Sequence, residues 1–124
     1  MPANSPEEIC DLFKRYMADG DLESVLTLYD ADAVFLNEAG EPAKGGRLKA
    51  ELAVLASART AFEFKIRKVV RADDVALMHT DWEMSSLRRM SVRAVEVARR
   101  QKDGTWRWLI GDPFTVGKRL ESDY

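Results

Sequence analysis

Glu96 is the residue of this sequence whose type and setting are best suited to chemistry. Its neighbours two positions away, Ala94 and Ala98, are small and apolar. In a β-strand these three side chains share one face, so the alanines leave space around the carboxylate. Burial there would raise the pKa of the carboxyl group and could keep it protonated as a hydrogen-bond donor. The alternative is an ion pair between Glu96 and an arginine on a solvated face.

Asp112 is the second candidate, as the partner of Glu96 in a carboxylate pair. Its position depends on the turn that joins the two strands around Asp103-Gly104. A two-residue turn places Gly111 opposite Glu96. A three-residue bulged turn instead places Ile110 opposite and brings Asp112 to the same face. The sequence does not choose between these registers, and it favours a simpler role in which Asp112 caps the end of its strand.

Aromatic and metal-binding residue types give weaker signals. Trp82, Tyr16 and Phe35 lie in apolar stretches and could line a ligand site, but such side chains more often fill a core. His79 is the only histidine, and Asp81 and Glu83 on its strand face form a plain solvated stripe as often as a metal site. The single cysteine, Cys10, excludes an intramolecular disulfide. We therefore expect no metal and no cofactor.

Composition predicts one globular domain over residues 1–124, with an ordered core at about 5–116 and a polar tail at 117–124. The chain is 46% hydrophobic and 32% charged, with a net charge of -2, which excludes disordered and fibrous classes. The arginine pairs at 88–89 and 99–100 lack the interleaved aromatics of a nucleic-acid groove. Without a long apolar run or a basic leader, we expect a cytoplasmic protein that binds neither membrane nor nucleic acid.

The elements that must position these residues follow from periodicity. Ser5-Pro6-Glu7-Glu8 is a helix-start signal, and an apolar stripe at helical spacing follows it (Ile9, Leu12, Phe13, Tyr16 and Met17). A second helix is predicted at 22–29 after Asp21, and a third opens at Gly45-Gly46. Strands are predicted at 33–36, from 61 onward with a bulge at Val69-Val70, and at 75–84, 91–101 and 105–110. Helices followed by a run of consecutive strands indicate an α+β fold and not alternating β-α-β units.

The strand predicted at 91–101 carries apolar residues on both faces. Val95 and Val97 lie on one face, and Val92, Ala94 and Ala98 on the other. An antiparallel sheet with one face in water alternates cleanly between apolar and polar residues. Both faces must therefore be covered, and we expect a homodimer formed through the sheet.

Residues 20–23 (Gly-Asp-Leu-Glu), leading into 28–35 (Leu-Tyr-Asp-Ala-Asp-Ala-Val-Phe), resemble the SnoaL-like branch of the nuclear transport factor 2-like superfamily. Residues 71–77 with 81–82, and 96–101 with 103–108 and 112–114, are similar to its YybH-type bacterial subgroup. The resemblance implies a cone-shaped, curved antiparallel sheet with about three helices, a cystatin-like roll around a small-molecule pocket. It also implies a partner sheet on the outer face.

Relatives in this superfamily include ketosteroid isomerases, polyketide cyclases, dehydratases and epoxide hydrolases, so the resemblance implies a fold and not one reaction. By comparison with the isomerases, their general base falls on Asn37, whose amide cannot take a proton from carbon. Their oxyanion-hole acid falls on Glu96. Their tyrosine falls near Leu12, with Tyr16 one turn later. Only one of three roles is kept, so the resemblance does not imply an isomerase.

Three function hypotheses follow. The first is a cofactor-independent acid-base enzyme of the isomerase, cyclase, dehydratase or hydrolase type. It would act on a small apolar substrate, with Glu96 as the acid and Asn37 as a polar anchor, and with Trp82, Tyr16, Phe35 and Asp112 as further binding candidates. The second is a non-catalytic ligand-binding or dimerisation module, and the third is an accessory domain for assembly. A carboxyl with a raised pKa that faces a cavity would favour the enzyme. An apolar cavity without polar groups would favour the ligand-binding module, and an interior filled by side chains would favour the accessory domain.

Overall fold

The computed structural model describes residues 2–86 and 89–116, so the predicted polar tail lies outside the described residues. The first helix, α1 (Pro6–Ala18), begins as predicted. The Ser5 hydroxyl accepts a hydrogen bond from the Glu8 N–H over 3.2 Å, and the proline occupies the first turn, where its missing N–H costs nothing. The predicted apolar stripe is the buried face of this helix.

The second helix, α2 (Leu22–Leu26), is shorter than predicted. Its start is confirmed, because the Asp21 carboxylate accepts from the Ser24 N–H over 3.2 Å. Its predicted end at Tyr29 is wrong, since Tyr29 already begins a strand. The Leu28 carbonyl accepts the Trp108 N–H over 2.8 Å, and the Tyr29 ring packs 5.5 Å from the Trp108 ring. These long-range contacts outweigh the local helical pattern.

Six strands form one sheet in the order β2-β1-β6-β5-β4-β3. They are β1 (Tyr29–Leu36), β2 (Pro42–Ala43), β3 (Ala61–Ala72), β4 (Val75–Ser85), β5 (Arg89–Arg100) and β6 (Trp106–Asp112), with α3 (Gly46–Ser57) between β2 and β3. The antiparallel meander from β3 to β6 is confirmed. The sheet is nevertheless mixed and not antiparallel throughout, because β1 pairs with β6 in parallel. The β3 bulge lies at Arg67 and not at the predicted valines.

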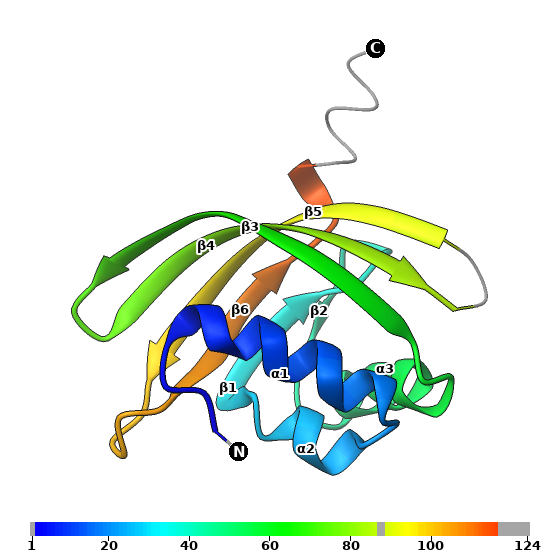
Figure 1. The fold of residues 1–124 in the computed structure, drawn as a ribbon, viewed down its shortest axis with the longest axis horizontal. Coiled ribbons are helices and arrows are strands. Elements are labelled where there is room, and N and C mark those ends of the chain that lie inside the picture. The colour runs from blue at the N-terminus through cyan, green and yellow to red at the C-terminus, as the bar shows by residue number, and fades with distance from the viewer. Residues whose placement is uncertain (1, 87–88, 117–124) are drawn as a thin grey trace.

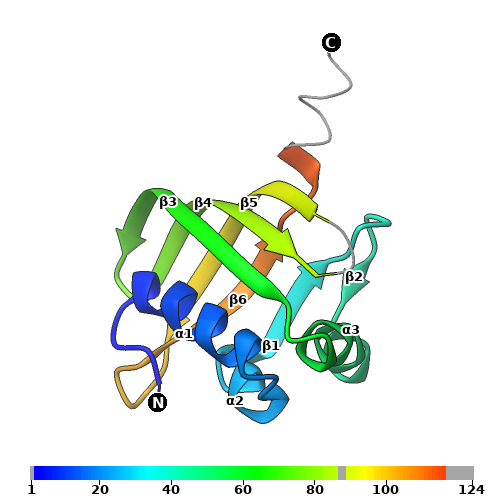
Figure 2. The ribbon, with the colours of Figure 1, turned by 45° about the vertical axis from the view of Figure 1, so that its right-hand side comes forward.

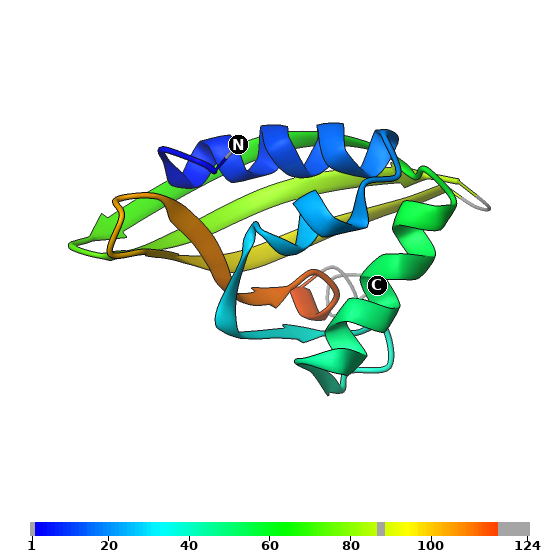
Figure 3. The same cartoon turned by 90° about the horizontal axis from the view of Figure 1, so that it is seen from below.

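The sheet is curved, and the helices lie on its concave side (Figures 1 and 2). We call this side the inner face and the opposite side the outer face. Seen from below, α1 runs along the sheet, and α3 lies beyond the C-terminal end of α1 (Figure 3). On β4, Ala76, Met78, Thr80 and Trp82 are buried on the inner face, because successive side chains of a strand point to opposite sides. The cone interior is therefore lined by alternate residues of the long strands.

Aromatic rings occupy much of this interior. The Phe13 ring of α1 lies 4.9 Å from Phe62, 5.4 Å from Trp82 and 5.2 Å from Trp108, measured between ring centroids. Such tilted and edge-on pairs stabilise a core beyond the area they bury. These rings pack α1 against β3, β4 and β6. They also flank the inner-face residues of β5, which lies between β4 and β6.

Candidate functional site

Glu96 lies on the inner face of β5, in register with Met78 on β4 and Gly111 on β6. Its residue exposure is only 4%, although it is a carboxylic acid. The flanking alanines, Ala94 and Ala98, are buried on the same face and leave room for it, as the sequence indicated. This burial excludes the alternative of an arginine ion pair on a solvated face.

A hydrogen bond from Trp82 holds the Glu96 carboxyl. The indole N–H of Trp82 donates to Oε2 over 3.1 Å. The other oxygen, Oε1, and the hydroxyl of Thr80 are both buried without a hydrogen-bond partner in the described part of the chain. An unpartnered buried polar atom costs free energy, so one half of this carboxyl is available to a further polar group.

Burial raises the pKa of Glu96 from an ordinary 4.5 to about 7. The low-polarity surroundings disfavour the charged form, and this effect dominates. Thr80 and the Trp82 indole oppose part of the rise, although the Thr80 hydroxyl does not reach hydrogen-bond geometry. Both protonation states of Glu96 are consequently populated near neutral pH, which suits a group that donates or accepts protons.

Other titratable groups point into the same region. Burial raises the pKa of the Cys10 thiol of α1, and the Glu96 charge adds to this effect. Burial also raises the pKa of the Tyr29 phenol, again with a contribution from Glu96. Both groups therefore stay neutral and cannot act as nucleophile or base at neutral pH. The helix dipole does not activate Cys10, because its thiol lies in the core.

The aromatic candidates are placed in or against the core, as the sequence favoured. Trp82 and Tyr16 are buried, and Phe35 is half-buried. A Cβ atom on Gly111 would lie only 2.1 Å from the Phe35 ring, so the ring rests directly on the glycine backbone. Trp82 contacts Glu96 through a hydrogen bond. Phe35 instead covers the strand position opposite Glu96.

Asn37 serves the loop that follows β1. Its side-chain oxygen accepts from the Ala39 N–H over 3.1 Å and from the Glu41 N–H over 3.0 Å. An asparagine that bonds to its own downstream backbone in this way stabilises a turn. Its oxygen is thus already used, and only its amide NH₂ group remains to anchor a ligand.

Asp112 does not join Glu96, which corrects the carboxylate-pair hypothesis. It lies opposite Val95, whose side chain points to the outer face. The β5–β6 turn contains three residues between Gln101 and Thr105, because the Gln101 N–H donates to the Thr105 carbonyl over 2.7 Å. A bulge at Leu109 then shifts the register of the two strands by one residue. The Asp112 carboxylate accepts from the backbone N–H groups of residues 114 and 115, at 3.2 and 3.1 Å. It caps the strand end, as the alternative predicted.

The residues weighed for a metal lie on the outer face. Asp81 pairs with Arg67 at 3.5 Å, and His79 lies opposite Val95 and Lys68. Within residues 2–86 and 89–116, no group of three or more His, Cys, Asp or Glu side chains could hold a metal ion. A hollow of about 310 Å³ opens near Glu63, Glu83 and Arg89, and none of the predicted site residues lines it.

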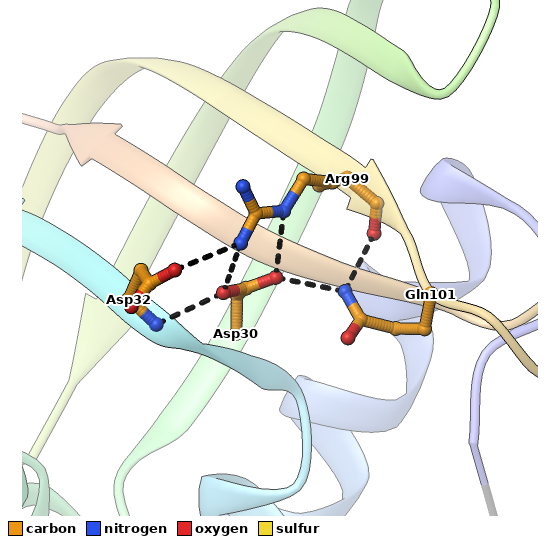
Figure 4. A network of polar contacts seen from close by, with 4 residues as sticks. All are labelled: Asp30, Asp32, Arg99 and Gln101. Atoms are coloured by element: carbon orange, nitrogen blue, oxygen red, sulfur yellow. Dashed lines mark hydrogen bonds and ion pairs between the residues drawn. The ribbon is translucent and has the colours of Figure 1, made fainter.

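The sequence missed one polar network, centred on Asp30 (Figure 4). Arg99 on β5 reaches across β6 and donates to both Asp30 oxygens, at 3.0 and 2.6 Å, while the Gln101 amide donates over 2.8 Å. Burial would raise the pKa of Asp30, but these bonds outweigh it and lower the pKa to about 2. Arg99 also contacts Asp32 at 3.2 Å. The network holds β1 where its backbone pairing with β6 is irregular.

None of the described helices has the length and apolar character needed to cross a membrane. Comparison with curated proteins gives no match. Among solved structures, an uncharacterised cystatin-like protein of Caulobacter vibrioides is 15% identical with a TM-score of 0.75, covering 94% of this chain and 91% of that one. A ketosteroid isomerase-like protein of Erwinia carotovora atroseptica is 20% identical with a TM-score of 0.62, covering 86% and 89%.

A domain of unknown function from Nostoc punctiforme, also with a cystatin-like fold, is 15% identical with a TM-score of 0.69, covering 94% of this chain and 80% of that one. At these identities the likenesses show the fold alone, and they confirm the predicted nuclear transport factor 2-like, cystatin-like architecture. The model of the SnoaL-like domain matches residues 11–108, which is most of the chain. The protein therefore belongs to the SnoaL-like domain family.

Proposed function

We propose that this domain binds a small, neutral, largely apolar molecule at the inner face of the sheet and that Glu96 exchanges a proton with it. The observation that carries the proposal is the Glu96 carboxyl itself. It is 4% exposed, has a pKa of about 7 and keeps Oε1 without a partner. A carboxyl of this kind is costly to the fold, and such groups cluster at functional sites.

The chemistry follows from the two protonation states. Protonated Glu96 can donate to a ligand carbonyl or hydroxyl through the unpartnered side of its carboxyl. Deprotonated Glu96, whose negative charge the Trp82 indole stabilises, can accept a proton from an acidic C–H or O–H group, and the negative charge then passes to the ligand. A second charged group is not needed, so the reaction type we propose is proton transfer without metal or cofactor.

The surroundings support an apolar ligand. Trp82 and Trp108 present buried rings beside Glu96, and further along the inner face Phe64, Met84 and Val92 are only half-buried. A ligand that entered at this less buried end would displace apolar contacts and would bring its polar atom to Glu96. A charged ligand would lose its hydration without a counter-ion, so neutral molecules are favoured.

The rival proposal is binding without catalysis. The aromatic packing around Phe13, and the Phe35 ring that rests on Gly111, support a domain whose interior is mostly filled by its own side chains. In that case Glu96 orients a bound ligand or serves only the packing of the core, and no proton is transferred.

Binding can be tested with neutral probes. Cyclohexanone and phenol would be titrated while the fluorescence of the buried tryptophans is followed between about pH 5 and pH 9. We expect binding to the wild-type chain to change with a midpoint near pH 7, and we expect Glu96→Gln to abolish this midpoint. Glu23→Gln, at an exposed position in the first turn of α2, is the matched control. Equal pH profiles for all three proteins would contradict the proposal.

Proton transfer can be tested separately. The exchange of the α-hydrogens of cyclohexanone with deuterated water would be followed by NMR in the presence of each protein. Exchange that depends on Glu96 supports the acid-base function. If Glu96-dependent binding occurs without exchange, the non-catalytic proposal is the better account.

A further inference from the structure

Two further polar atoms of the core lack a hydrogen-bond partner in the described part of the chain. They are the indole Nε1 of Trp108 on β6 and the hydroxyl oxygen of Thr80 on β4. Each of these residues is only 1% exposed. A buried N–H or hydroxyl without a partner costs free energy, so these two atoms and Oε1 of Glu96 need a common explanation.

The strand register gathers these residues around Glu96 on the inner face. Thr80 is the next inner-face residue of β4 after Met78, which lies directly opposite Glu96. Trp108 lies opposite Ala98, two positions from Glu96 on β5. Diagonal neighbours of this kind are within reach of long side chains.

Ring packing brings the two indoles together beside the carboxyl. The Trp108 ring lies 6.2 Å from the Trp82 ring, and both rings pack on Phe13 of α1. Trp82 bonds to Glu96 although its own register partner is Val92, four positions from Glu96. Trp108 is closer to Glu96 in register than this residue that already contacts it.

The Trp82 hydrogen bond decides which oxygen of neutral Glu96 carries the proton. A protonated carboxyl has one hydroxyl oxygen, which donates, and one carbonyl oxygen, which is the better acceptor. Since the indole donates to Oε2, Oε2 is the carbonyl oxygen and the proton lies on Oε1. The free side of neutral Glu96 is therefore an O–H donor.

We propose that the Trp108 N–H, the Thr80 hydroxyl and Oε1 of Glu96 bind one oxygen atom of the ligand, and that the Glu96 proton sets the class of ligand. This inference rests on the proposed function. With the proton present, all three groups can donate, so they select an oxygen that only accepts, as in a ketone. Without it, Oε1 accepts while the indole still donates, which suits the hydroxyl of an alcohol.

Glu96 is the group that titrates in this arrangement. Its inner-face neighbours on β4 and β6 are uncharged (Met78, Thr80, Trp82, Trp108 and Gly111). The Cys10 thiol of α1 and the Tyr29 phenol of β1 also face it, and burial raises the pKa of each, so both stay neutral. The pKa of Glu96 is about 7, so the selection should reverse between pH 5 and pH 9.

Space for the ligand oxygen requires a side chain to repack, because these polar atoms are closed to solvent. Met78 is fully buried directly opposite Glu96. Its unbranched thioether side chain adapts more readily than a branched or aromatic one, so we expect Met78 to move when the ligand enters.

Matched ligands test the selection. Cyclohexanone and cyclohexanol have the same ring and stay neutral at both pH values, and their binding would be measured by ligand-observed NMR titration. We expect the ketone to bind about fivefold more tightly than the alcohol at pH 5, as one additional hydrogen bond predicts. At pH 9 the alcohol should bind at least as tightly as the ketone. A ratio that is the same at both pH values would overturn the inference.

Glu96→Gln tests the position of the proton. The Trp82 N–H needs an acceptor, so it should hold the amide oxygen at the Oε2 position and turn the NH₂ group to the Oε1 position. The variant then has a permanent donor and should prefer the ketone at pH 9 as well as at pH 5. Preference for the alcohol at either pH contradicts the assignment.

Trp108→Phe and Thr80→Val each remove one polar atom and keep a similar shape, so each should weaken cyclohexanone binding by about fivefold. Trp106→Phe is the matched control, because that buried ring lies near Arg71 and Arg100 at the other end of the strands. Thr80→Val keeps the test available if Trp108→Phe does not fold.

The outcomes separate this inference from the proposed function. If neither probe binds in a way that depends on Glu96, both fail. If binding depends on Glu96 but the folded Trp108 and Thr80 variants bind like Trp106→Phe, this inference alone is wrong.

Discussion

The Trp82 indole donates its N–H to Oε2 of Glu96 over 3.1 Å, across the β4–β5 pair and inside the core. The bond is diagonal, since Met78 and not Trp82 lies directly opposite Glu96. It gives the carboxylate one polar partner in a setting that otherwise disfavours charge. The protonation of Glu96 is consequently tied both to the stability of the fold and to the proposed chemistry.

The first prediction concerns stability against pH. The pKa of Glu96 rises from 4.5 to about 7 on folding, so the folded chain binds more protons than the unfolded chain between these values. The contribution of Glu96 to the free energy of unfolding should be greatest below about pH 4.5 and should fall by roughly 3 kcal/mol as the pH rises past 7. Glu96→Gln should lack this fall and be at least as stable as wild type near pH 8. Urea unfolding at several pH values measures both.

The second prediction isolates the indole. Trp82→Phe removes the donor that stabilises charged Glu96, so the pKa of Glu96 should rise further, by about 1. Carboxyl-carbon NMR titration reports this pKa directly. Trp106→Phe is the control, because that ring stacks near Arg71 and Arg100 at the other end of the strands. An unchanged Glu96 titration in Trp82→Phe would show that the hydrogen bond has no effect on protonation.

The third prediction concerns the Asp30 network. Asp30→Asn should lower the free energy of unfolding at neutral pH by about 2 kcal/mol, because charged hydrogen bonds to Arg99 and Gln101 are lost. The pKa of Asp30 is lowered to about 2, so this contribution is present above about pH 4 and lost as the pH falls towards 2. Asp74→Asn breaks an exposed pair with Arg100 and should cost less than about 1 kcal/mol. Equal losses would contradict the assigned role of Asp30.

The fourth prediction concerns close packing at the strand opposite Glu96. Gly111→Ala would place a methyl group within 2.1 Å of the Phe35 ring, so overpacking should destabilise the fold by about 2 kcal/mol. Phe35→Ala alone should also destabilise it, through lost packing. Combining the two should cost less than the sum of the single changes. Strict additivity in thermal or urea unfolding would mean that the ring does not press on this glycine.

Local pattern was enough to determine much of this protein. The capping signal at Ser5 fixed the start of α1, and the period of two placed His79, Asp81 and Glu83 on one face of β4 correctly. The small neighbours of Glu96 indicated a carboxyl with space around it, and the structure buries that carboxyl. These features depend on residues within a few positions of one another, so they can be recognised without knowing which strands pair.

Only the tertiary structure decided what depends on distant pairing. The bulge at Leu109 shifts the β5–β6 register and sends Asp112 to the outer face, which no turn signal encodes. The parallel pairing of β1 with β6 turns Tyr29 from a predicted helix into a strand and brings Asp30 to Arg99. Four strands likewise have to align before Val70, Leu77, Val97 and Ile110 meet on the outer face. Register joins residues far apart in the chain, and a one-residue shift reverses the face of every side chain beyond it.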